Sequence, residues 1–170
     1  MDIKTPKGVK SLLDERKAVQ LYLRYHPEVQ FVETNKKMPL AVDGLVIEGG
    51  RLRSLVEIKC RYDADLDMFF DEYSGEWLIT MAKVEKAIGL ATGLGVSFEG
   101  WLYVVQSNAL LVLPISSVEL DADECVKATV QNLRKAAYTD TQATINGGTA
   151  NRLNGYFDLY AATLYQGRVV

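Results

Sequence analysis

The sequence predicts a mixed α/β domain with a central sheet flanked by helices. Runs with helical spacing of apolar residues alternate with short β-branched runs, in the order helix, strand, strand, strand, helix, strand, strand, helix, helix. The chain of 170 residues is long enough for one domain with a substantial core and too short for two ordinary ones. We therefore expect a single domain over residues 1–170, with a core over about 8–115 and a C-terminal helical extension over 116–170.

The composition agrees with this class of fold. Hydrophobic residues make up 48% of the chain and charged residues 24%, which is typical of a soluble globular protein. No run approaches the roughly 18 apolar residues of a membrane span, and the polar, basic N-terminus lacks the apolar segment of a secretory signal. We expect a cytoplasmic protein without membrane contact, in which Cys60 and Cys125 are reduced thiols.

A helix is expected first, between the dipeptides Thr5-Pro6 and His26-Pro27. The former pairs an N-cap residue with proline at the first helical position, and the residue before the second proline disfavours the helical conformation. Glu15 lies at the edge of the apolar stripe and faces the sheet, whereas Asp14 is expected to point the other way. A first strand is expected over 29–34.

Two apolar, β-branched runs then flank Gly49-Gly50, over roughly 40–48 and 51–60. The two glycines tolerate positive φ angles and predict a tight hairpin turn. Glu57 and Lys59 are two residues apart and therefore share one face of the second strand. The turn brings Asp43 opposite roughly position 56, so two carboxylates and an ammonium group are expected to meet in the sheet.

The remaining elements follow from the same patterns. We expect an acidic loop over 62–76, a helix over 77–92, strands over 101–105 and 109–115, a helix over about 121–137, a loop over 139–151 and a helix over 152–165. The acidic loop holds no Lys or Arg, so a solvated loop is the simplest interpretation. The alternative is a lid that keeps duplex or product away from one side of the hairpin.

The hairpin residues fit phosphodiester hydrolysis. A hard cation such as Mg²⁺ prefers oxygen ligands, which Asp43, Glu57 and the carbonyl of Ile58 could supply. Such a metal polarises a phosphate oxygen and activates a coordinated water. Lys59 could orient that water, help to deprotonate it, or stabilise the developing negative charge.

The pattern Asp43, then Glu57-Ile58-Lys59, in an α-β-β-β-α-β order resembles the PD-(D/E)xK nuclease superfamily, whose fold is restriction-endonuclease-like. The resemblance implies a deoxyribonuclease that depends on Mg²⁺ or Mn²⁺. It also implies that Asp43, Glu57 and Ile58 bind the metal, that Lys59 acts on the water, and that Glu15 is an auxiliary ligand and part of the catalytic set. The run that ends in Cys60 looks more specifically like phage recombination exonucleases of the lambda exonuclease and YqaJ type. Arg61 stands here where those proteins usually have proline.

A basic rim around the hairpin is the best candidate for contacts with the DNA backbone. Arg51 and Arg53 share one strand face, which is expected to continue to Glu57 and Lys59. The candidate DNA-contacting residues are Lys36, Lys37, Arg51, Arg53, Arg61 and, in the helix after the hairpin, Lys83.

Three functions stay open at the level of sequence. The first is a nuclease, with a phage or mobile element as its expected source; we expect structure-specific or end-processing cleavage, because a chain of this length leaves no room for a separate recognition domain. The second is a catalytically inactive nucleic-acid-binding or assembly protein on the same fold. In the third, the hairpin carboxylates only form cross-strand salt bridges. Exonuclease or endonuclease action, DNA or RNA as substrate, and a homodimer or protein partner are not distinguished.

Overall fold

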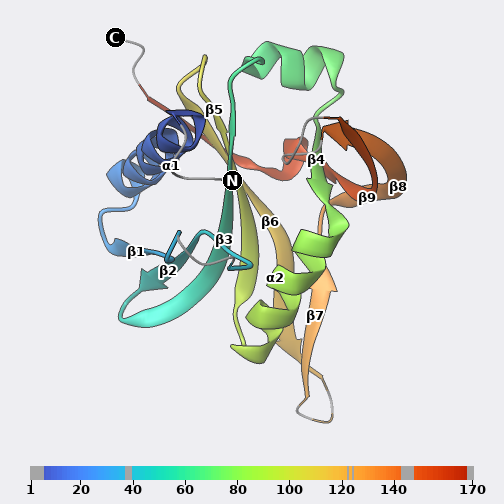
Figure 1. The fold of residues 1–170 in the computed structure, drawn as a ribbon. Helices are drawn as coiled ribbons and strands as arrows, with labels where there is room; N and C mark the ends of the chain where they lie inside the picture. The colour runs from blue at the N-terminus through green and yellow to red at the C-terminus, as the bar shows by residue number, and fades with distance from the viewer. Residues whose placement is uncertain (1–5, 37–39, 122, 124, 143–147, 168–170) are drawn as a thin grey trace.

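The structure is a computed structural model that describes residues 6–36, 40–121, 123, 125–142 and 148–167. It has the expected mixed α/β architecture, in which helix α1 (Pro6–Tyr25) and helix α2 (Met81–Gly93) flank a central mixed sheet (Figure 1). None of the described helices combines the length and the apolar character that crossing a membrane requires.

The central sheet contains the expected α-β-β-β-α-β order. Strands β1 (Val29–Glu33), β2 (Gly44–Glu48) and β3 (Arg51–Arg61) follow α1, and β5 (Ser97–Val104) follows α2. The seven-stranded sheet has the order β1-β2-β3-β5-β6-β10, with β7 also paired to β6. Strands β3 and β5 run parallel because α2 carries the chain back between them, and the other pairings among the described strands are antiparallel.

The hairpin of β2 and β3 has the predicted turn. Gly49 and Gly50 both have positive φ, 57° and 75°. Gly44 pairs with Val56, so the residue before β2, Asp43, lies opposite Glu57, one residue beyond the predicted position 56.

A bulge in β3 changes which residues share a face. Ile47 pairs with Leu52 and Val46 with Ser54, which leaves Arg53 as the extra residue. The Arg53 guanidinium turns to the α1 side and donates to the Tyr22 hydroxyl. The prediction that Arg53 lies on the face of Glu57 and Lys59 is therefore wrong.

Each face of the central sheet has its own core. On the α1 side, Val46, Val56 and Ile58 pack with helix residues including Ala18 and Leu21. On the α2 side, the core contains Leu55, Phe98 and Leu102 of the sheet, Val84 and Ala87 of the helix, and residues of a second, three-stranded sheet. Residues along β3 therefore alternate between the two cores, and Glu57, between Val56 and Ile58, faces the α2 side.

The predicted C-terminal helical extension is wrong. The described residues after 115 form strands: β6 (Ala109–Leu120), β7 (Val126–Val130), β8 (Leu133–Gln142), β9 (Thr149–Asp158) and β10 (Thr163–Gln166), with a 3-10 turn at Leu159–Ala161. Helices were expected over 121–137 and 152–165 and a loop over 139–151. The apolar residues in this region are spaced as in a helix, but strand pairing decides the structure. β7 contains valine and threonine, which favour strands, and pairs with β6. β8 pairs with β9, and β10 pairs with β6. β10 thereby returns the chain to the edge of the central sheet (Figure 1).

The stretch between β3 and α2 also differs from the expectation. The first residues of the predicted helix over 77–92 belong instead to strand β4 (Glu76–Thr80), and the helix begins at Met81. In β4 the buried Trp77 and Ile79 alternate with partly exposed residues. β4 joins β9 and β8 in the second sheet. The alternation of buried and partly exposed residues in β4 is that of a strand, which the helical prediction missed. The acidic segment over 62–76 contains a short π-helix, Met68–Glu72, where an irregular loop was expected.

Gly44, the residue after Asp43, lies close against the ring of Phe31. A Cβ atom on Gly44 would overlap the ring of Phe31, which packs against Trp101 with ring centroids 5.4 Å apart. We expect Gly44→Ala to destabilise the protein by about 1–3 kcal/mol, as overpacking of a filled core does. Chemical denaturation measures the change. Gly89→Ala in α2 is the matched control, because open space surrounds that position, and it should leave stability unchanged or raise it.

Candidate active site

Asp43 is fixed at the open end of the hairpin by hydrogen bonds of its backbone and of both carboxylate oxygens. Its backbone N–H donates to the carbonyl of Val56 at 2.7 Å. Its Oδ2 accepts from the backbone N–H of Ile58 at 2.8 Å, and its Oδ1 accepts from Lys36 Nζ at 2.6 Å. The carboxylate therefore lies beside the Glu57–Ile58 peptide, as the register predicted.

Glu57 and Lys59 meet on β3. Glu57 is only 6% exposed, and its Oε1 lies 2.6 Å from Lys59 Nζ. The same ammonium group donates to the carbonyl oxygen of Ile58 at 3.4 Å. Lys83 of α2 reaches Glu57 Oε1 from the other side, also at 3.4 Å. One buried carboxylate is thus shared by two lysines.

Glu15 of α1 joins the hairpin through Lys36. Lys36 Nζ lies 3.0 Å from Glu15 Oε2 and 2.6 Å from Asp43 Oδ1, so one ammonium group bridges the two carboxylates. Oε2 of Glu15 is buried and receives no well-aligned hydrogen bond from that neighbour or from any other described residue. The expectation that Glu15 faces the hairpin agrees with this geometry.

The predicted orientation of Asp14 is wrong. Its side chain is buried, and the residue is 2% exposed, whereas the apolar Val9 and Leu13 of the same helix are about half exposed at 48% and 52%. The buried stripe of α1 runs instead through Ser11, Asp14, Ala18 and Leu21. Asp14 pairs with Lys17 at 2.7 Å. A helical phase read from Ala18 and Leu21 would have placed Asp14 inside.

The charges of the site depend on one another. Burial alone would raise the pKa of Asp43, but Lys59, Lys36 and the Ile58 N–H outweigh it and hold that pKa below its usual value. Burial raises the pKa of Glu15. Burial would lower the pKa of Lys59, yet Glu57 and Asp43 raise it above its usual value. Lys59 is therefore protonated at neutral pH, which suits charge stabilisation and orientation better than proton abstraction.

The donor atoms fit a hard divalent cation by type. Asp43, Glu57, Glu15 and the Ile58 carbonyl offer oxygen, which Mg²⁺ and Mn²⁺ prefer, and Glu15 Oε2 is a buried oxygen without an aligned donor. Within the described residues, however, no group of three His, Cys, Asp or Glu side chains is arranged to hold a metal. The ammonium groups of Lys36 and Lys59 stand among these oxygens instead.

A cavity of about 230 Å³ opens on the α1 side of the hairpin. Glu15, Lys36, Asp43 and Ile58 line it together with Gln20 and Phe31. Part of the site is thus accessible from this cavity, whereas Glu57 faces α2 through its contact with Lys83.

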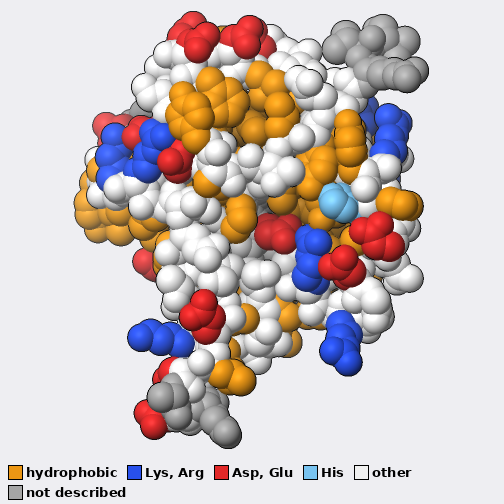
Figure 2. All heavy atoms as spheres, turned by 180° about the vertical axis from the view of Figure 1, so that it is seen from behind, with side chains coloured by type: hydrophobic (Ala, Val, Ile, Leu, Met, Phe, Trp, Pro, Cys, Tyr) orange, Lys and Arg blue, Asp and Glu red, His pale blue; other side chains and the backbone are white. Residues whose placement is uncertain are grey.

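The predicted basic rim is divided rather than continuous. Lys36 bridges two carboxylates and Lys83 pairs with Glu57. Arg53 pairs with Glu99 at 3.1 Å and with Glu48 at 3.6 Å. The other three predicted contacts differ in position: Arg51 is exposed at the hairpin turn, Arg61 lines a cavity described below, and Lys37 lies outside the described residues. On the face shown in Figure 2, Lys and Arg side chains lie scattered among Asp and Glu.

Both cysteines are free thiols, as expected. Cys60 is partly buried, and burial raises the pKa of its thiol to about 12. Cys125 is exposed, but it lies directly before β7 and outside the predicted helix.

No protein-family model and no curated protein sequence matches the chain. Among solved structures, the chain is similar to Hjc, a Holliday junction resolvase of the archaeal hyperthermophile Archaeoglobus fulgidus. The TM-score is 0.41 at 14% sequence identity, over 66% of this chain and 86% of that chain. A likeness this distant assigns neither a family nor an activity. The resemblance to PD-(D/E)xK nucleases therefore depends on the residue pattern and element order of this chain.

Proposed function

We propose that this protein is a deoxyribonuclease of the PD-(D/E)xK type, which hydrolyses DNA phosphodiester bonds with Mg²⁺ or Mn²⁺. One observation carries the proposal: the Lys59 ammonium lies beside Glu57 and the Ile58 carbonyl, within the electrostatic influence of Asp43. Burying charged groups is costly unless their charge is compensated. Salt bridges that served only to join two strands could form on the exposed surface without this cost, so the burial of these groups supports a role beyond strand pairing.

In the proposed mechanism, Asp43, Glu57 and the Ile58 carbonyl would hold the metal, with Glu15 as an auxiliary ligand. When bound, the metal polarises a phosphate oxygen and lowers the pKa of a coordinated water. Lys59, kept protonated by its acidic neighbours, orients the attacking water and stabilises negative charge that develops on the phosphate. Lys83 shares Glu57 with Lys59, which places its largely exposed side chain at the edge of the site.

The distribution of positive charge supports cleavage near a DNA end or a distorted structure. Arg53 is held by acidic partners and Lys36 bridges Glu15 and Asp43, so neither extends a basic track along the surface. A protein that contacts few phosphates gains little affinity for uniform duplex. Local features of the substrate then have more influence on binding.

A substrate panel tests the proposal. The protein is incubated with linear duplex, circular duplex, single-stranded and branched DNA in Mg²⁺, Mn²⁺ or a chelator, beside Asp43→Asn. We expect metal-dependent cleavage of ends, single strands or branches, and loss of cleavage in the variant. Cleavage that persists in Asp43→Asn would overturn the site assignment. Matched RNA substrates decide between the two nucleic acids.

A second function has its own supporting observation. Three site carboxylates, Glu15, Asp43 and Glu57, are matched in this structure by the ammonium groups of Lys36, Lys59 and Lys83. Such a neutral cluster needs no metal, which favours a catalytically inactive nucleic-acid-binding or assembly protein. DNA binding in the panel without cleavage of any substrate, and without heat of metal binding in calorimetry, would select this alternative.

A further inference from the structure

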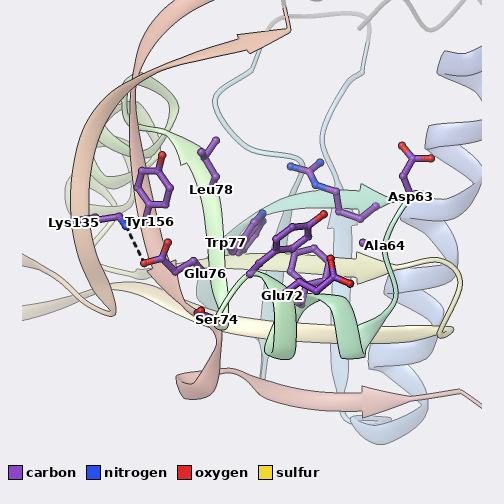
Figure 3. A pocket seen from close by; sticks show the side chains of 12 residues that line it. Asp63, Ala64, Glu72, Ser74, Glu76, Trp77, Leu78, Lys135 and Tyr156 are labelled. Carbon is purple, nitrogen blue, oxygen red and sulfur yellow. Dashed lines mark ion pairs between the residues drawn. The ribbon is translucent and has the colours of Figure 1, made fainter.

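A second, larger cavity lies where β3 ends. It has a volume of about 620 Å³, within the usual range for small-ligand sites. The acidic segment after β3, strand β4 and the second sheet form its walls. Figure 3 shows Asp63 and Ala64 at one end, Lys135 and Tyr156 at the other, and Trp77 and Glu72 between them.

Two donor groups at this cavity have no acceptor among the described residues. Arg61 makes no side-chain hydrogen bond or ion pair with any described residue, and burial lowers its pKa. Trp77 is 1% exposed, and its indole Nε1 is buried without an acceptor in the part of the chain that the structure describes. The Trp77 N–H is closed off from the cavity in this structure, so the partly exposed Arg61 guanidinium is the donor that a ligand can reach, and it favours a ligand that brings acceptors.

The rest of the lining is aromatic and acidic. Tyr73 and Tyr156 line the cavity; the Tyr73 ring is partly exposed, whereas Lys135 Nζ lies over the Tyr156 ring, 4.6 Å from its centroid. Lys135 is held by Glu76 at 3.2 Å, whereas Asp63 and Glu72 have no ion-pair partner among the described residues. Acceptors, donors and flat apolar surfaces therefore meet in one cavity. This combination suits a flat heterocycle with amino groups and ring acceptors better than it suits a bare anion, which the two carboxylates would repel.

We propose that this cavity binds a single unstacked nucleobase that carries an exocyclic amino group. The amino group donates to Asp63 or Glu72, Arg61 donates to ring or carbonyl acceptors of the base, and the partly exposed ring of Tyr73 packs against its face. Thymine lacks an exocyclic amino group and is the disfavoured base. The proposal deepens the proposed function, on which its choice of DNA as the source of the base rests.

The cavity is also in the right place for this role. Glu57, Lys59 and Arg61 follow one another at every second residue of β3 and so share a strand face. Four residues of strand span about 13 Å at roughly 3.3 Å per residue. A base bound beside Arg61 therefore belongs to a nucleotide close to the phosphate at Glu57 and Lys59, and it would select an unpaired nucleotide next to the cleaved bond.

Binding without cleavage tests this inference. Fluorescence anisotropy in a chelator compares short oligonucleotides of deoxyadenosine, deoxycytidine and thymidine with an abasic one of equal charge. We expect roughly tenfold tighter binding of the amino-bearing oligonucleotides than of the thymidine or abasic ones, the scale of one stacked and hydrogen-bonded base. Calorimetry with free deoxyadenosine and thymidine repeats the comparison without a DNA backbone.

Variants separate the cavity from general charge effects. Glu72→Ala combined with Asp63→Ala should remove the base preference, whereas Asp71→Ala, an exposed acidic neighbour that does not line the cavity, should keep it. Arg61→Gln should weaken the binding of base-containing oligonucleotides more than Arg24→Gln does. Arg24→Gln is a change of the same type on the exposed surface of α1. Circular dichroism confirms that each variant is folded.

The outcomes distinguish this inference from the proposed function. Equal binding of all four oligonucleotides, or a preference that survives the double variant, overturns the base site, even if Mg²⁺-dependent cleavage is found. A preference for deoxyadenosine that is abolished by the double variant supports the base site, even if no DNA is cleaved.

Discussion

Replacing Lys59 by alanine is expected to lower the rate of DNA cleavage by about a thousandfold, within the range attributed to a single positioned catalytic group. The reason is local: the Lys59 ammonium is the positive group that contacts both Glu57 Oε1 and the Ile58 carbonyl. Its loss removes charge where negative charge develops on the phosphate. Single-turnover cleavage of the best substrate from the panel measures the effect.

Two further measurements make the Lys59 result specific. Lys86→Ala, on the exposed surface of the same helix as Lys83, should cleave at the wild-type rate. Thermal denaturation shows whether Lys59→Ala is folded, since Glu57 keeps Lys83 as a partner at 3.4 Å. A folded Lys59→Ala protein that cleaves at the wild-type rate would show that Lys59 is not part of the catalytic set.

The first half of the fold followed from local sequence because its signals are local. The bounds of α1 coincide with the predicted helix, and the Gly49-Gly50 turn fixed the hairpin and its register to within the one residue that the bulge at Arg53 adds. The C-terminal third could not be predicted in this way. Strands β8, β9 and β10 are defined by partners far away in the chain, such as β4 for β9 and β6 for β10. Their residues also show an apolar spacing compatible with a helix, and tertiary pairing decided between the two.

The site was predictable where it depends on the hairpin and was missed where it depends on contacts between elements. Asp43, Glu57 and Lys59 follow from strand parity and turn register. The sequence predicts Lys36 only as a DNA contact, and it takes the packing of α1 against the hairpin to place its ammonium group between Glu15 and Asp43. The bulge that turns Arg53 toward Tyr22 leaves no mark in the apolar pattern of β3.

Lys36 leads to the second large expected effect, on metal affinity. Its ammonium group lies 2.6 Å from Asp43 Oδ1 and 3.0 Å from Glu15 Oε2, where it neutralises two carboxylates that would attract a divalent cation. In Lys36→Gln the charge is gone and the two carboxylates repel each other. We expect Mg²⁺ or Mn²⁺ to bind about tenfold more tightly, equivalent to about 1.4 kcal/mol, as measured by calorimetry on metal-free protein.

The same substitution should reduce the stability of the metal-free protein and make it depend on metal. Without the ammonium group, two partly buried carboxylates lack their shared partner, so the melting temperature in a chelator should fall and should recover when Mn²⁺ is added. Arg16→Gln is the control, because Arg16 lines the same cavity but pairs with Glu33, at 3.6 Å. If Lys36→Gln and Arg16→Gln bind metal equally, the ammonium of Lys36 does not stand in the place of the cation. If only Lys36→Gln gains affinity and metal-dependent stability, then metal binding and the Lys36 bridge exclude each other, and Lys36 must leave Asp43 before the site can act.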